Sequence, residues 1–173
     1  MSQLRVNSIV PVGGVQTSGA YGGIIQIKPA FTNLTTVESS SNTFADITDM
    51  SVTITPSSTA SKFLIMTNMT VAHNNSGAAI FLNLVRNSTP IAQNQSSSFP
   101  CTSTLHFGNE VYGAFNYSYQ HLDETNLTNT NDITYKWQMR TNIGAVTVNQ
   151  RSTANDLYST SNLIVCEVTG VDP

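Results

Sequence analysis

The stretch KFLIMTNMTVA, residues 62–72, decides the fold class because its apolar side chains recur at alternate positions. Side chains of a β-strand point alternately to the two faces of a sheet, so this period of two predicts a strand. Leu64 and Met66, early on the second face, are apolar as well, which is typical of a central strand covered by other layers. The first face carries Phe63, Ile65, Thr67, Met69 and Val71.

Similar alternation occurs on both sides of residues 62–72, and turn-forming residues separate the runs at intervals of roughly 8–15 residues. No segment has a convincing helical period. This pattern is typical of a β-sandwich, so we predict an all-β fold, a jelly-roll-like antiparallel β-sandwich. The further strands are expected at residues 23–28, 43–55, 79–86, 91–92, 111–122, 133–140, 145–149 and 163–168.

The composition excludes several classes of protein. The chain has 173 residues, which is enough for one domain with a real core. Charged residues make up only 10%, while Ser, Thr and Asn make up about a third. Lys, Glu and Ala are too few for a helical bundle. With a net charge of −3, the chain has no basic field for nucleic acid or an anionic membrane, so neither is an expected partner.

Residues 1–22 read as a separate tract before the sandwich domain at 23–173. Gly and Pro are too dense there for a helix or a long strand. The tract is nevertheless too apolar for a free linker, so we expect an extended segment that mediates attachment or oligomerisation. Its candidate attachment residues are Leu4, Val6, Ile9, Val10 and Val12.

The start of the chain does not resemble a signal peptide, and no apolar run approaches the roughly 20 residues that cross a bilayer. We therefore expect synthesis in a cytoplasm without membrane insertion.

Histidine and cysteine positions indicate no metal site and no cofactor. His73, His106 and His121 are dispersed along the chain; we expect His73 in a turn and His121 packed. Cys166 lies in an apolar strand and is expected to be a buried, reduced packing residue. Cys101 lies in a polar loop, and a disulfide between the two cysteines stays open, as does a metal ion on an oligomer axis.

No motif assigns a catalytic residue. The chain has no Gly-x-Ser-x-Gly sequence and no phosphate-binding loop, and Glu38, Glu110 and Glu167 appear isolated. We therefore expect a protein that is not an enzyme. A pair of carboxylates for glycoside hydrolysis stays an open alternative, because folding can bring distant acids together.

Three polar loops, at 93–103, 123–132 and 151–160, are the best candidates for binding a host glycan. Their neutral amides and hydroxyls donate and accept hydrogen bonds as sugars do. The candidate glycan contacts are Gln93, Asn94, Gln95, Asn126, Asn129, Asn131 and Asn155.

An aromatic face is expected in the core, with an exposed sugar-stacking platform as the alternative. Its residues expected in the core are Phe115, Tyr119, Tyr135 and Trp137.

The order and the amino-acid sequences of these strands and turns resemble those of a family of small structural proteins of tailed bacteriophages that infect marine bacteria, especially cyanophages. The resemblance implies a tail-fibre or other appendage protein of the virion: a trimeric β-sandwich head with an N-terminal attachment tract. The stretches that carry it are LRVNSIVPVGG at 4–14, GGIIQIK at 22–28, FADITDMSVTITPSSTASKFLIM at 44–66, LNLVRNSTPI at 82–91, YSYQHLDETNLTNTNDITYKWQMR at 117–140 and VNQRST at 148–153.

Three functions are therefore weighed. The first is a non-enzymatic, homotrimeric appendage head that contacts the host surface and binds other virion proteins through residues 1–22. The second is a capsid decoration or head-fibre protein without a receptor role. The third is a glycan-degrading enzyme. The expected strand at residues 62–66 is apolar on both faces. One small sandwich buries only the face that points to its core, so the apolar outer face also favours an oligomer.

Overall fold

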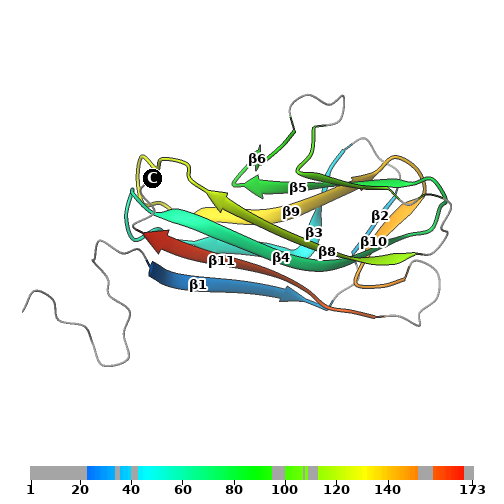
Figure 1. The fold of residues 1–173 in the computed structure, drawn as a ribbon, viewed down its shortest axis with the longest axis horizontal. Helices are drawn as coiled ribbons and strands as arrows, with labels where there is room; N and C mark the ends of the chain where they lie inside the picture. Colours follow the sequence, from blue (N-terminus) through cyan, green and yellow to red (C-terminus); the bar gives the residue numbers. More distant parts are fainter. Residues whose placement is uncertain are drawn as a thin grey trace, which may run out of the picture.

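The structure, a computed structural model, describes residues 23–33, 36–39, 43–94, 100–106, 108, 113–151 and 158–169. Residues 1–22, and with them the expected attachment tract, lie outside this part of the chain. All regular elements of the described residues are β-strands (Figure 1). They are β1 (Gly23–Thr32), β2 (Thr36–Ser39), β3 (Ala45–Ile54), β4 (Lys62–His73), β5 (Ala79–Arg86), β6 (Thr89–Ile91), β7 (Ser103–His106), β8 (Ala114–Asp123), β9 (Ile133–Thr141), β10 (Ala145–Val148) and β11 (Ser161–Thr169).

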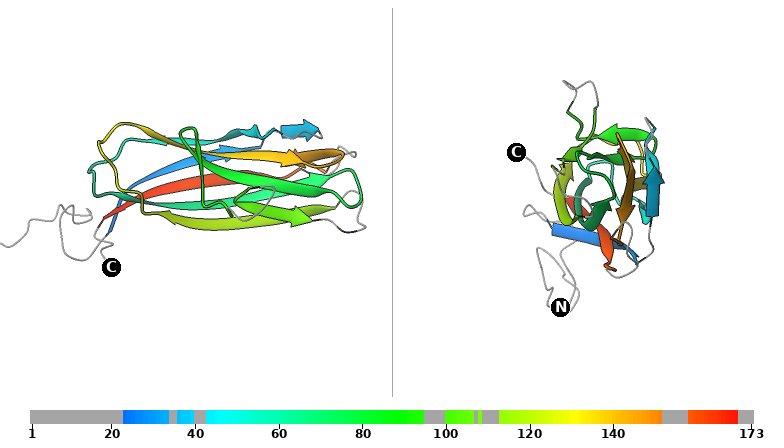
Figure 2. Two further views of the ribbon diagram at one scale, coloured as in Figure 1. Left: turned by 90° about the horizontal axis from the view of Figure 1, so that it is seen from above. Right: turned by 90° about the vertical axis from the view of Figure 1, so that its right-hand side faces the viewer.

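The strands form two antiparallel sheets that pack face to face (Figure 2). The larger sheet has the order β1-β11-β4-β10-β2, and β8 pairs with the other edge of β4. The smaller sheet has the order β3-β9-β5-β6, and β7 also pairs with β5. Strand β4 pairs with β11 and β10 along one edge and with β8 along the other. The predicted antiparallel β-sandwich and the central position of residues 62–72 are thus confirmed.

The core lies between the sheets and follows the alternation of β4. Phe63, Ile65, Met69 and Val71 are each at most 1% exposed, and Thr67, on the same face, is buried as well. Burying one such apolar side chain fully stabilises the fold by about 1.5–3 kcal/mol. The smaller sheet contributes Ile80, Leu82, Leu84, Tyr135, Trp137 and Met139 to the same cluster.

Trp137 explains why a threonine occupies the apolar face of β4. Its Nε1–H donates to Thr67 Oγ1 at 2.7 Å, which satisfies the buried indole. The rings of Tyr117 and Tyr119 meet Trp137 edge to face, with centroids 5.8 and 5.5 Å away. The prediction that the aromatic face belongs to the core is confirmed for Tyr119, which is half-buried, and for Tyr135 and Trp137. It is wrong for Phe115, which is 43% exposed.

Two short strands were not expected from the sequence. Strands β2 and β7 each have four residues, too few for alternation to distinguish a strand from a loop. His73 was expected in a turn, but it is the last residue of β4 and is fully buried. Burial lowers the pKa of its imidazole, and its Nδ1 accepts a hydrogen bond from the Asn75 N–H at 3.2 Å.

Both cysteines are free and buried. Cys166 is 1% exposed, as its apolar strand predicts. Cys101 lies in the loop before β7, as predicted, but it is buried there against Ala79 and Phe81, and its Sγ lies 3.1 Å from Thr104 Oγ1. None of the described residues belongs to a helix long and apolar enough to cross a bilayer.

Candidate functional site

A polar pocket of about 400 Å³ lies where the β5–β6 turn meets the loop between β8 and β9. Three of the predicted glycan contacts, Asn126, Asn129 and Asn131, line it together. Arg86 and Asn87 line it from the turn. The structure therefore gathers one group of the predicted site residues at a single concave surface. The other lining residues are Thr125, Leu127, Thr128, Asp132 and Ile133.

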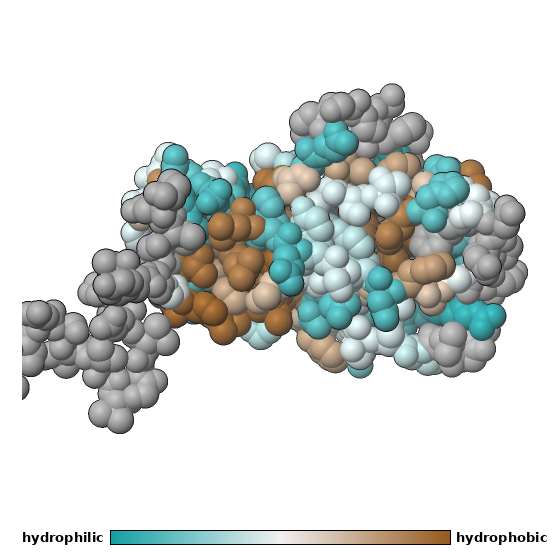
Figure 3. All heavy atoms as spheres, viewed as in Figure 1, coloured by the Kyte–Doolittle hydropathy of each residue, from teal (hydrophilic) through white to brown (hydrophobic). Residues whose placement is uncertain are grey.

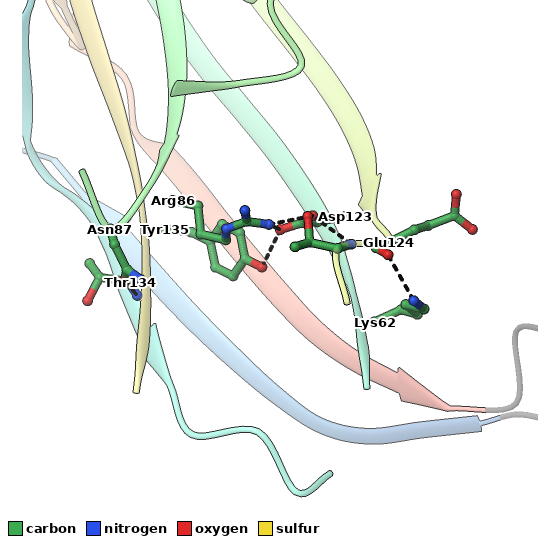
Figure 4. A network of polar contacts seen from close by, with 8 residues as sticks. Lys62, Arg86, Asn87, Asp123, Glu124, Thr134 and Tyr135 are labelled. Atoms are coloured by element: carbon green, nitrogen blue, oxygen red, sulfur yellow. Dashed lines mark hydrogen bonds and ion pairs between the residues drawn. The ribbon is translucent and has the colours of Figure 1, made fainter. Parts of the chain in front are cut away.

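The carboxylate of Asp123 holds the base of this region together (Figure 4). Arg86 Nη1 donates to Oδ1 at 2.9 Å and to Oδ2 at 2.7 Å. The Tyr135 hydroxyl donates to Oδ2 at 2.8 Å. The sequence placed Asp123 in a solvated loop, and this is wrong: the residue ends β8 and is 5% exposed.

These contacts fix the charge of the group. Burial alone raises the pKa of the Asp123 carboxyl, but hydrogen bonds from Thr125, Tyr135 and Arg86, together with the charge of Arg86, outweigh burial and lower it. Burial and then the neighbouring Asp123 charge raise the pKa of Tyr135. At neutral pH the group is thus an ion pair beside a neutral phenol, and Arg86 brings no uncompensated charge to the pocket.

The loop above Asp123 is held by local hydrogen bonds. Asp123 Oδ1 accepts from the backbone N–H of Thr125 at 3.2 Å and from its hydroxyl at 2.7 Å. Asn129 Oδ1 accepts from the N–H of Asn131 at 3.0 Å. Such contacts, in which Asx side chains accept from a backbone N–H two residues on, stabilise turns. They position the pocket wall before any ligand arrives.

Hydrogen bonds made by Lys62 and Asn87 hold the β8–β9 loop and the β5–β6 turn, which form the two sides of the pocket. Lys62 Nζ donates to the carbonyl of Glu124 at 2.8 Å (Figure 4). It also donates to Asn126 Oδ1 at 3.3 Å. Asn87 has a left-handed backbone, with φ of 56°, a conformation that asparagine tolerates better than most residues. Its N–H donates to the Thr134 carbonyl at 2.7 Å, and its Oδ1 accepts from the Thr134 N–H at 2.9 Å.

The lining chemistry suits a neutral polyhydroxylated ligand. Amides and hydroxyls supply donors and acceptors, while Leu127 and Ile133 add an apolar surface against which the face of a sugar ring can pack. Asp132 is the one acidic residue of the lining, and its Oδ1 accepts from the Thr55 hydroxyl. The pocket offers many hydrogen bonds and few titratable groups.

The other predicted contacts are not gathered at this pocket. Gln93 and Asn94 follow β6, and Gln93 Nε2 donates to Asn83 Oδ1 at 2.9 Å, which holds its own loop against β5. Gln95 and Asn155 lie outside the described residues. The same is true of Leu4, Val6, Ile9, Val10 and Val12.

A second cluster of polar side chains surrounds Glu167, and the sequence does not predict it. Glu167 appears isolated in the sequence, but it is fully buried on β11 and accepts hydrogen bonds from Gln26, Ser57 and Ser61. The backbone N–H of Ser57 also donates, at 2.7 Å. Burial raises the pKa of the carboxyl, and these donors outweigh it and lower the pKa. Because its oxygens are occupied, Glu167 joins β1 and β11 to the β3–β4 turn rather than serving as a free acid or base.

Among the described residues, no three His, Cys, Asp or Glu side chains gather closely enough to hold a metal ion. In comparisons with known proteins, no family model matches the chain and no curated protein matches its sequence. The pocket between the β5–β6 turn and the β8–β9 loop is therefore assessed on its own geometry.

Proposed function

We propose that this protein is a non-enzymatic structural protein of a bacteriophage virion, a homotrimeric appendage head that binds a glycan of the host surface. The observation that carries the glycan-binding role is the pocket that brings Asn126, Asn129 and Asn131 together beside Leu127 and Ile133. The resemblance of the sequence to phage appendage proteins supports the setting. The low content of charged residues, 10%, supports a surface that works at high salt, where ion pairs are screened.

Oligomerisation would compensate for a weak single site. Each neutral hydrogen bond contributes a net ~0.5–1.5 kcal/mol, so one shallow pocket binds weakly. Several linked pockets raise the effective affinity through avidity when they engage one polysaccharide chain or surface.

The β5–β6 turn and the β8–β9 loop, which line the pocket, lie at the end of the sandwich where β1 begins and β11 ends (Figure 1). In the proposed virion, residues 1–22 would attach the head to another virion protein. When extended, 22 residues span at most roughly 80 Å, which leaves room between the pocket and the particle.

Replacing Asn131 by alanine is expected to weaken glycan binding roughly 2- to 13-fold, which corresponds to the loss of one net hydrogen bond. The measurement is binding of the full chain to immobilised surface polysaccharides of marine bacteria, cyanobacteria included. Asn33→Ala is the matched control, because Asn33 is also exposed but follows the end of β1, which pairs with the start of β11 away from the pocket. Equal binding by both variants contradicts this pocket. Shortened polysaccharide chains contradict the non-enzymatic role, and dense capsid labelling without cell binding favours a decoration protein.

Removing residues 1–22 is expected to leave a folded β-protein, because both sheets are built from residues after 22. The shortened protein should keep the far-ultraviolet circular dichroism of the full chain but no longer sediment with virions. A shortened protein that unfolds would show that the tract belongs to the core.

A further inference from the structure

The outward face of the larger sheet carries an apolar patch four strands wide. The strand register places Ile27 of β1 beside Cys166 of β11, Cys166 beside Leu64 of β4, and Leu64 beside Leu122 of β8. The next outward row contains Ile164 beside Met66. On the other side of the Ile27 row lies the row of Ile24, Val168 and Lys62. These three rows are called the outer patch below.

The outer patch is partly open to solvent in the single chain: Ile27 on β1 is exposed, and Cys166 is buried between its neighbours. The half-buried members are Leu64, Met66, Leu122 and Ile164. Ile24 is 44% exposed and Ile27 is 55% exposed, and Phe31, two outward positions further along β1, is 61% exposed. The space-filling view shows the apolar atoms gathered on one face over β1, β11 and β4 (Figure 3). Contiguous apolar patches of this kind on soluble proteins mark surfaces that bind a partner.

Electrostatic repulsion does not prevent the outer patches of two copies of this chain from meeting. These outward rows contain one charged residue, Lys62. It pairs with Val168, which in turn pairs with Ile24. Its ammonium group donates to the Glu124 carbonyl and to Asn126, so it is engaged with the β8–β9 loop. A charged patch would repel its own copy, whereas this apolar one is compatible with itself.

The width of the outer patch also favours another sheet as its partner. Four strands at about 4.8 Å spacing make a face roughly 15 Å wide. A single extended peptide segment would cover only about a third of that width. Two further copies placed around a common axis each present a face of the same width, so together they can cover it.

We infer that the outer patch is the contact face between copies of this chain, arranged around an axis that runs along the strands. Because Gly23 pairs with Thr169 at one end of this sheet, such an axis brings the 22-residue tracts of all copies out at the same end. The inference rests on the proposed homotrimer and assigns the surface that forms it.

The test is the mass of the full chain and its variants in solution, measured by light scattering at micromolar concentration. The wild-type chain should have three times the 18.7 kDa mass of one chain, and Ile27→Lys should have the mass of one chain. Ile143→Lys is the matched control, because Ile143 is 39% exposed but lies in the turn between β9 and β10. Ile24→Lys provides a second variant in the same patch.

A wild-type chain that is monomeric overturns the inference, and so does an Ile27→Lys variant that remains trimeric while folded. Circular dichroism checks folding, which an exposed position should leave unchanged. Glycan binding is measured on the same samples: the monomeric variant should keep the weak affinity of one pocket and lose only avidity. Absence of binding by a trimeric wild type would contradict the glycan-binding role and leave the contact face standing.

Discussion

Replacing Glu167 by alanine is expected to lower the free energy of unfolding by about 1–3 kcal/mol, the cost of leaving a buried donor without its acceptor. The substitution removes the shared acceptor of Gln26, Ser57 and Ser61. Ser61 is buried, Gln26 is half-buried and Ser57 is exposed, so the cost comes mainly from Ser61. Each unsatisfied buried donor costs about 1–3 kcal/mol. Urea unfolding followed by fluorescence of Trp137, the single tryptophan, measures the change.

Glu124→Ala is the matched control for Glu167→Ala, because the Glu124 side chain is exposed just after β8. Its substitution should change the free energy of unfolding by less than about 0.5 kcal/mol. Equal losses in the two variants would show that the Glu167 contacts do not stabilise the fold. All variants are compared at one protein concentration, because oligomerisation adds to apparent stability.

The lowered pKa of Glu167 also sets the direction of a pH dependence. Between the folded and unfolded pKa values the unfolded chain binds more protons, so the stability from this group is fully present above about pH 4.5. It is lost as the pH falls through the folded pKa. Glu167→Gln should therefore show a shallower loss of stability on acidification than the wild-type chain. The remaining slope comes in part from Asp123, whose pKa is lowered as well.

Alternation predicts which face of a strand a residue occupies, but it does not predict how deeply that residue is buried. The alternation of residues 62–72 predicts the inner face of β4 correctly because the smaller sheet covers that face. Phe115 lies on the predicted inner face as well, opposite Val71, and yet it is 43% exposed. It lies near the start of β8, which occupies an edge of the larger sheet.

Contacts between distant residues account for what the sequence reading missed. The donors to Glu167 come from positions 106 to 141 residues away, which no local pattern connects. Arg86 and Asp123 are 37 residues apart and meet only because β5 and β8 end at the same place. Asn126, Asn129 and Asn131 could be predicted together because one short loop holds all three.

Replacing Asp123 by alanine is expected to destabilise the protein by about 3–5 kcal/mol, because the largely buried Arg86 guanidinium and the Tyr135 hydroxyl lose their shared acceptor. The loop that lines the pocket also loses the anchor of Thr125, so glycan binding should weaken in the same variant. The control is Asp46→Ala, which breaks the ion pair with Lys136. The Asp46 side chain is 54% exposed, and such surface pairs contribute at most about 1 kcal/mol.

A double-mutant cycle separates the ion pair from its surroundings. Arg86→Met removes the cation and keeps an apolar stem of similar length, so the double variant Arg86→Met with Asp123→Ala leaves no unpaired charge. Its loss of stability should be smaller than the sum of the two single losses by about 0.5–3 kcal/mol, the coupling typical of residues in contact. Additive losses would mean that Arg86 and Asp123 stabilise the fold independently. In that case the 2.7 Å contact between them contributes nothing measurable, and Tyr135 and Thr125 account for the cost of losing Asp123.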